Sequence, residues 1–153
     1  MSYIKKSLAQ TGANATTELA IPTLLTVDGK AGWNILGMDI YVSGLGAAVN
    51  AVADGQCLIE LNTEATPQSY DDPDNIIFHQ FQFSGITAST TALQVFGGEQ
   101  VRLILPRLTV QPTLYLNISS SGLLTAVTAN IQIVYEIVKL SDIEVMRLMQ
   151  GGA

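Results

Sequence analysis

The stretches TLYLNISS (residues 113–120) and VTANIQIVYEIVKL (residues 127–140) predict two β-strands joined by a short Ser/Gly loop. In the first stretch, Leu114, Leu116 and Ile118 alternate with side chains of mixed polarity. Alternation with a period of two is typical of a strand that turns one face to a core. In the second stretch the expected core positions are Ile131, Ile133, Tyr135 and Ile137.

Further strand-like runs cover the chain before this pair. They are predicted at residues 33–42, 56–62, 76–83 and 100–105, with weaker runs at 18–27 and 84–91. In the run 33–42 we expect Leu36, Met38, Ile40 and Val42 to share one face, and Ile35 to lie on the other. Seven or eight short strands at this spacing predict an all-β protein, an antiparallel β-sandwich of jelly-roll type with a short C-terminal helix.

The chain divides into three predicted parts. Residues 1–17 are small and polar, which favours an arm rather than a packed element. Residues 18–140 form the sandwich, and residues 141–150 form the helix. No internal repeat or linker divides the sequence further, so we expect one domain.

The C-terminal helix has a clear start signal. Ser141 followed three residues later by Glu144 fits a capping box. Ile143, Met146 and Met149 form an apolar stripe along the predicted helix. An isolated helix of about ten residues is marginal in water, so this helix must dock. The sequence leaves open whether it docks on its own sandwich or on a neighbouring subunit, and the stripe is our candidate subunit interface.

The composition favours self-association. Of the 153 residues, 48% are hydrophobic and only 13% are charged, against a usual charged share of about 25%. A surface rich in Thr, Ser, Asn and Gln costs less to desolvate than a charged one. The net charge is −6 and the basic residues are scattered apart from Lys5 and Lys6. Strong nucleic-acid binding is therefore not expected.

Two further features bear on location. There is no run of about eighteen apolar residues, so no transmembrane segment is expected. The start of the chain has two lysines but no apolar stretch behind them, which argues against a signal peptide. We therefore expect the chain to be made and assembled in a cytoplasm.

No catalytic constellation is apparent, and we expect neither enzymatic activity nor a cofactor. The single histidine, His79, lies in an aromatic strand and is interpreted as a core or interface residue. The single cysteine, Cys57, is interpreted as a buried apolar side chain. The acidic turn Asp71, Asp72 and Asp74 is either a solvated turn or a cation site, because hard oxygen ligands suit Ca²⁺.

The segments LYLNISSSG (114–122), IQIVYEIVK (131–139) and SDIE (141–144) resemble the end of small single-jelly-roll viral structural proteins, including bacteriophage-type capsid subunits. The resemblance implies a virion protein that assembles in the host cytoplasm with itself and with other virion proteins. Many such subunits carry a long basic arm, whereas this chain has only Lys5 and Lys6 there. Another component would then handle the genome.

The alternative is a trimeric jelly-roll spike, a decoration protein or a carbohydrate-binding module. Such a module needs exposed aromatic side chains, and the candidates are Trp33, Tyr70 and Tyr115. A cupin-type enzyme would need a histidine and carboxylate metal set, which one histidine cannot supply.

Overall fold

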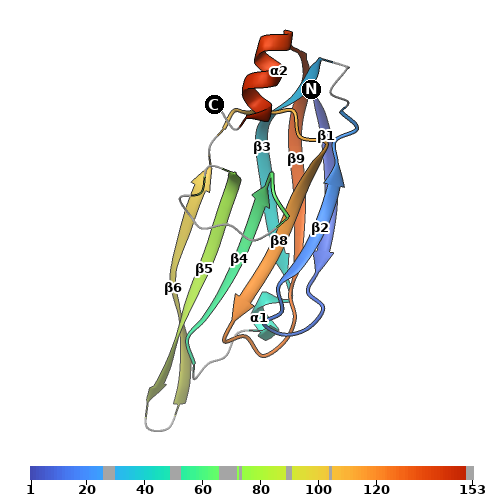
Figure 1. The fold of residues 1–153 in the computed structure, drawn as a ribbon. Coiled ribbons are helices and arrows are strands. Elements are labelled where there is room, and N and C mark those ends of the chain that lie inside the picture. The colour runs from blue at the N-terminus through green and yellow to red at the C-terminus, as the bar shows by residue number, and fades with distance from the viewer. Residues whose placement is uncertain are drawn as a thin grey trace.

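The computed structural model describes residues 1–25, 30–48, 53–65, 72, 74–88, 91–103 and 105–150. Within these residues nine antiparallel strands form two stacked sheets, and a short helix lies at one end (Figure 1). The predicted all-β sandwich with a C-terminal helix is confirmed. Neither helix in the described part of the chain has the length and apolar character that a membrane span requires.

The four-stranded sheet has the order β1-β9-β3-β7, and the five-stranded sheet has the order β2-β8-β4-β5-β6. The bounds of the strands in the four-stranded sheet are β1 (Ser2–Ala9), β9 (Thr128–Lys139), β3 (Ala31–Ser43) and β7 (Arg107–Thr109). Those in the five-stranded sheet are β2 (Thr17–Pro22), β8 (Thr113–Ser121), β4 (Gly55–Asn62), β5 (Asn75–Ala88) and β6 (Thr91–Leu103). The helices are α1 (Leu45–Ala48) and α2 (Asp142–Met149).

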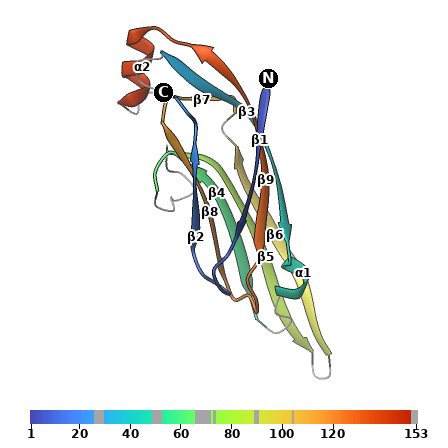
Figure 2. The same cartoon turned by 90° about the vertical axis from the view of Figure 1, so that its right-hand side faces the viewer.

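The strand pairs nest within one another along the chain. The first strand pairs with the last, β2 pairs with β8, β3 pairs with β7, and β4 pairs with β5. Successive strands from β1 to β4 alternate between the two sheets, so the chain winds around the core. The hairpin of β5 and β6 projects past the other strands at the end opposite α2 (Figures 1 and 2).

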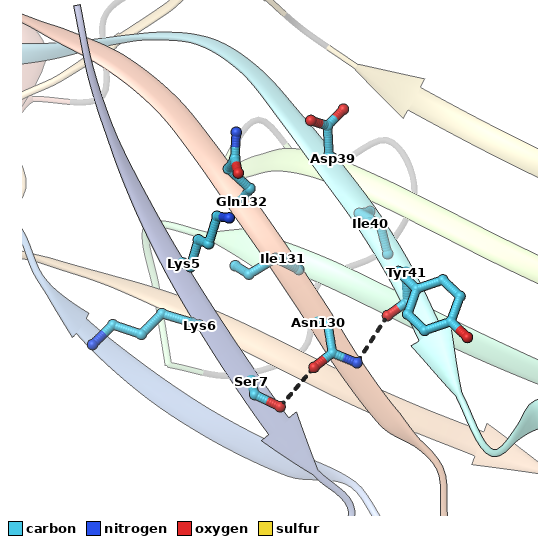
Figure 3. Close-up of a pocket in the computed structure, with 9 residues that line it drawn as sticks. All are labelled: Lys5, Lys6, Ser7, Asp39, Ile40, Tyr41, Asn130, Ile131 and Gln132. Carbon is cyan, nitrogen blue, oxygen red and sulfur yellow. Dashed lines mark hydrogen bonds between the residues drawn. The ribbon is translucent and has the colours of Figure 1, made fainter.

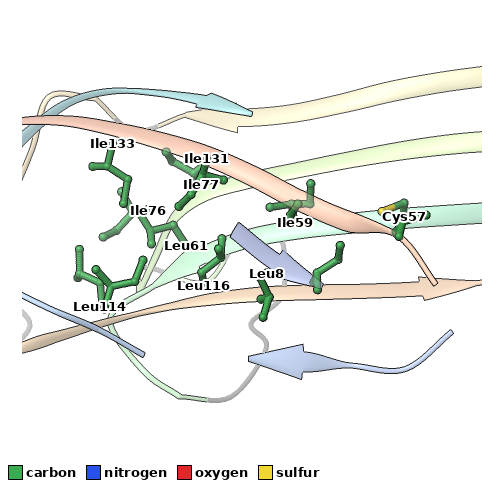
Figure 4. Close-up of a cluster of buried hydrophobic side chains, with 14 of the residues drawn as sticks. Leu8, Cys57, Ile59, Leu61, Ile76, Ile77, Leu114, Leu116, Ile131 and Ile133 are labelled. Atoms are coloured by element: carbon green, nitrogen blue, oxygen red, sulfur yellow. The ribbon is translucent and has the colours of Figure 1, made fainter. Parts of the chain in front are cut away.

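The core lies between the sheets, where the predicted alternation places it (Figure 4). Leu114, Leu116 and Ile118 of β8 are fully buried, as expected. Burying one such side chain contributes about 1.5–3 kcal/mol. In β9, Ile131 and Ile133 are buried and Tyr135 packs against the core, whereas Ile137 remains 64% exposed.

Strand β3 departs from its predicted alternation. Its register against β9 shifts between Ile35 and Gly37. The extra residue in this bulge moves Ile35 to the core side, where it is fully buried, together with Met38 and Ile40. The expectation that Ile35 lies on the opposite face from Met38 and Ile40 is therefore wrong, because a bulge reverses the alternation on one side of it.

The N-terminal segment is not an unpacked arm. Residues Ser2–Ala9 form strand β1, which pairs along its whole length with β9. Ile4 and Leu8 pack into the core, and Leu8 is only 7% exposed. Backbone pairing with β9 orders this polar segment, although its composition contains little apolar area.

The middle of the chain also differs from the prediction. The runs expected at 76–83, 84–91 and 100–105 fall largely within two long paired strands, β5 and β6. Residues 89, 90 and 104 lie outside the described residues. Strand β7 was not expected from the sequence, and it holds only three residues.

Candidate interaction surface

The C-terminal helix α2 begins with the predicted capping box. The Ser141 hydroxyl accepts a hydrogen bond from the Glu144 amide at 3.3 Å, and the Glu144 carboxylate accepts one from the Ser141 amide at 2.7 Å. The hydrogen bonds that the Ser141 amide and hydroxyl donate to the Glu144 carboxylate lower the pKa of Glu144, with a smaller contribution from Arg147. The helix ends at Met149, and Gly151 and Gly152 lie outside the described residues.

The helix docks on its own sandwich through one face. Val145 is buried and Leu148 packs beside it, against Val110 and Leu140. This small cluster is separate from the main core. Val138, which also belongs to it, lies on the face of β9 that points away from Ile133. Helix α2 therefore docks at one end of the outer face of the four-stranded sheet.

The absence of a side chain at Gly32 makes room for the leucines that contact the helix. A Cβ atom at Gly32 would lie 3.0 Å from Leu108 Cδ1, Leu140 Cδ1 and the Thr109 carbonyl oxygen. Leu108 and Leu140 belong to the cluster that holds the helix. A larger residue at position 32 would push these leucines out of place.

The predicted stripe is not the face that docks. Ile143, Met146 and Met149 are 72%, 58% and 53% exposed. They lie beside Val145 and Leu148 on the helix and point away from the sandwich. The helix thus docks on the sandwich through one face and leaves an apolar stripe in solvent.

Other exposed apolar side chains lie at the same end of the molecule as α2. Ile137, 64% exposed, is near the end of β9. Leu24, 88% exposed, follows Thr23, whose amide donates to the Pro112 carbonyl at 2.9 Å. The N-terminus also lies there (Figure 1). We call the set Leu24, Ile137, Ile143, Met146 and Met149 the helix-end surface. Side chains of this size on a soluble surface indicate an interaction site when they gather.

A second feature is a polar hollow of about 420 Å³ on the outer face of the four-stranded sheet (Figure 3). Asn130 crosses it and links three strands. It accepts a hydrogen bond from the Ser7 hydroxyl at 2.9 Å and donates to the Tyr41 carbonyl oxygen at 3.4 Å. The ring of Tyr41 is 69% exposed, and Lys5 and Asp39 line the next row. No feature of the sequence singled out this hollow, because its residues come from three distant segments.

The aromatic residues expected to form a binding face do not gather. Trp33 is buried and stacks on Tyr135, with ring centroids 3.8 Å apart. Tyr115 is half-buried on β8, and Tyr70 lies outside the described residues. The expectation that Trp33 is exposed is wrong, because the bulge in β3 keeps Trp33 and Ile35 on the core side.

The remaining candidate residues are His79, Cys57 and the acidic turn, and their surroundings are typical of structural roles. His79 is paired with Glu99 of the neighbouring strand and stacks on Phe81. Burial raises the pKa of the Cys57 thiol to about 11. In the acidic turn, the Asp72 carboxylate accepts a hydrogen bond from the Asp74 amide at 2.9 Å, and Asp71 lies outside the described residues. No group of three or more potential metal-binding His, Cys, Asp or Glu side chains occurs among the described residues.

Comparison with known proteins assigns the chain to no family. No family model matches this sequence, and no curated protein matches it either.

Proposed function

We propose that this chain is a virion structural protein, a self-assembling shell subunit without enzymatic activity. The observation that carries the proposal is the exposed stripe Ile143, Met146 and Met149 on a helix that is capped and docked by other residues. Because the helix is capped and docked through its other face, its backbone is already ordered before its exposed stripe is covered.

The strand order supports the jelly-roll part of the proposal. A jelly roll arises when a long antiparallel hairpin folds over, which leaves nested pairs split between two sheets. The pairs β1 with β9, β2 with β8, β3 with β7 and β4 with β5 have this arrangement. The strand β6 extends one sheet beyond it.

A stable contact between subunits must bury more surface than the helix stripe alone provides. Specific interfaces bury about 1,200–2,000 Å² in total, which three side chains cannot supply. Leu24 and Ile137, which complete the helix-end surface, are exposed at the same end of the sandwich. A contact there between subunits, or with another virion protein, would bury the whole surface. Assembly of the particle would then take place in the host cytoplasm, without strong nucleic-acid binding by this subunit.

The test compares the mass of the purified protein by light scattering with negative-stain images. The double substitution Met146→Asp and Met149→Asp places two charges in the proposed contact and should lower the assembled fraction at least tenfold. The matched control is Leu124→Asp, which changes an exposed apolar residue in the loop at the opposite end, 59% exposed. A wild-type chain that stays monomeric across protein concentration and salt would contradict the proposal.

A second candidate function rests on the polar hollow. The exposed Tyr41 ring beside Asn130, Asp39 and Lys5 offers an apolar platform with hydrogen-bonding groups around it. This combination suits a sugar ring, and it favours the carbohydrate-binding module among the alternatives. Glycan-array binding that disappears with Tyr41→Ala, while the assembled mass is unchanged, would support this function. An array without any binding at millimolar glycan would refute it.

A further inference from the structure

The hairpin of β5 and β6 continues beyond the strand that supports it. Strand β4 pairs with β5 as far as Phe83, which lies opposite Gly55. Past that point residues 84–88 of β5 pair with residues 91–95 of β6, and no third strand among the described residues runs beside them. We call residues 84–88 and 91–95 the distal hairpin, and it projects at the end opposite α2 (Figures 1 and 2). A two-stranded hairpin is marginally stable by itself in water, so a further strand would stabilise it.

Strand β6 is also an open edge. It is the outermost strand of the five-stranded sheet, and the structure describes no neighbour on its other side. Proteins block such edges with charges, with prolines or by keeping the strand short, because an open edge can pair with another chain. The other three sheet edges carry these features. Strand β1 has Lys5 and Lys6, β2 has Glu18 and ends at Pro22, and β7 holds only three residues.

The unblocked part of β6 is confined to the distal hairpin. The register of β6 against β5 shifts at Gly97, which forms a bulge, and a bulge turns an edge away from a partner. After the bulge β6 carries Glu99 and Arg102. Before it, residues 91–96 (TALQVF) contain no charge and no proline, and several of them favour a strand. This segment therefore lacks every feature that protects the other edges.

We infer that the distal hairpin is a dimerisation arm, in which β6 of one copy pairs with β6 of a second copy. When the same edge of two identical chains pairs, the contact closes around a two-fold axis and the strands run antiparallel. With Leu93 on the axis, Thr91 lies opposite Val95 of the second copy, and Ala92 lies opposite Gln94. This register places no charged residue in the pairing.

Two features favour a second copy as the occupant of this edge. Each chain carries a net charge of −6, yet the paired segments are uncharged, so identical copies meet there without like-charge repulsion. The distal hairpin projects past the other strands, so antiparallel pairing of two arms directs the two sandwiches away from each other (Figure 2). The contact is smaller than the usual interface of about 1,200–2,000 Å², and we expect a weak dimer with a micromolar Kd.

The dimer leaves the helix-end surface of each copy free. Helix α2 and the distal hairpin lie at opposite ends of the chain's long axis, so the two helix-end surfaces would stand at the far ends of the dimer (Figure 1). The arm is therefore a second contact, and it does not depend on the one proposed at the helix. A subunit with contacts at both ends can join more than one neighbour, as a shell requires.

The first experiment uses the full chain with Met146→Asp and Met149→Asp, so that association through the helix-end surface is removed. Sedimentation velocity from about 1 μM to about 1 mM should show a monomer giving way to a dimer. Leu93→Lys in this background places two like charges on the two-fold axis and should weaken the dimer at least tenfold. Ile86→Lys is the matched control, because Ile86 lies opposite Leu93 in the same hairpin but on β5, away from the axis. It should leave dimerisation unchanged.

A cysteine variant keeps the test valid if Leu93→Lys fails to fold. Residues directly opposite on antiparallel strands have Cβ atoms about 5 Å apart, so Leu93→Cys brings two thiols together on the axis. Oxidation with copper phenanthroline should then link two copies through a disulfide. Ile86→Cys should give no such link, and the native Cys57 is buried.

Three outcomes would overturn the inference: a monomer at every concentration in the aspartate background, no disulfide-linked dimer from Leu93→Cys, or equal effects of the two lysine substitutions. Each of these leaves the helix-end contact to its own test. Conversely, wild-type dimers that are lost with Leu93→Lys, without any larger particle, would support the arm and refute the shell function.

Discussion

The Tyr135 ring stacks on the indole of Trp33, with 3.8 Å between the ring centroids and 14° between the ring planes. The register pairs Trp33 with Ile137 and Tyr135 with Ile35, so the two rings meet diagonally across β3 and β9. Trp33 is the only tryptophan of the chain. Its fluorescence therefore reports on the contact between the two central strands of the four-stranded sheet.

Replacing Tyr135 by Leu should lower the free energy of unfolding by about 1 kcal/mol, because a stacked aromatic pair contributes about 0.5–1.5 kcal/mol beyond its buried area. Urea unfolding followed by tryptophan emission and by far-ultraviolet circular dichroism measures the change. Tyr41→Leu, which alters a tyrosine that is 69% exposed, is the control and should leave the transition in place. Equal effects of both substitutions would show that the stack contributes nothing specific.

Gly122 is required where β8 turns toward β9. Its φ is +67°, and a Cβ atom there would lie only 2.0 Å from the carbonyl oxygen of Asp54. Gly122→Ala should therefore destabilise the protein by more than about 1 kcal/mol, since both the backbone and the contact must change. Gly12→Ala is the control, because a Cβ at Gly12 meets nothing within 4 Å. Thermal unfolding of the two variants should differ clearly.

The capping box makes helix α2 sensitive to acid. Hydrogen bonds from Ser141 lower the pKa of Glu144 in the folded protein. The stabilisation is thus complete above the unfolded pKa, about 4.3, and disappears as the pH falls through the lower folded pKa. Amide hydrogen exchange in residues 142–149 should become faster at pH 3 than at pH 6, after correction for intrinsic rates. In Glu144→Gln this difference should shrink, and an identical difference in both proteins would contradict the prediction.

The thiol of Cys57 should be unreactive in the folded protein. Burial raises its pKa to about 11 and excludes reagent from the sandwich core. Labelling with a disulfide reagent at pH 8 should be at least a hundredfold slower in the native protein than in guanidinium. Rapid native labelling would show that the five-stranded sheet opens near β4.

Deleting residues 2–9 should destabilise the sandwich as well as its assembly. The deletion removes an edge strand that pairs with eight residues of β9 and uncovers the core beside Leu8. Truncation after Leu140 should have a smaller effect on the fold, because it removes a helix attached through the small cluster around Val145. Thermal unfolding of the two truncated proteins ranks these effects. A lower midpoint for the helix truncation would reverse the expected order.

The sequence alone was sufficient to predict the strands and the helix start whose signals lie within a few neighbouring residues. Strands β8 and β9 alternate over their whole length, and the capping box depends on two residues three positions apart. The buried faces of these strands and the start of helix α2 therefore followed from the sequence, because strand alternation and helix capping are short-range effects.

Long-range contacts decided the rest. The polar residues of β1 become a strand only because β9 offers hydrogen bonds along one edge. The bulge in β3 brings Ile35 and Met38 to the same face of the sheet. The helix stripe was visible in the sequence, but only packing determined that Val145 docks and Met146 remains exposed. The polar hollow joins strands that are distant in the chain, and no local pattern encodes which distant segments the folded sheets bring together.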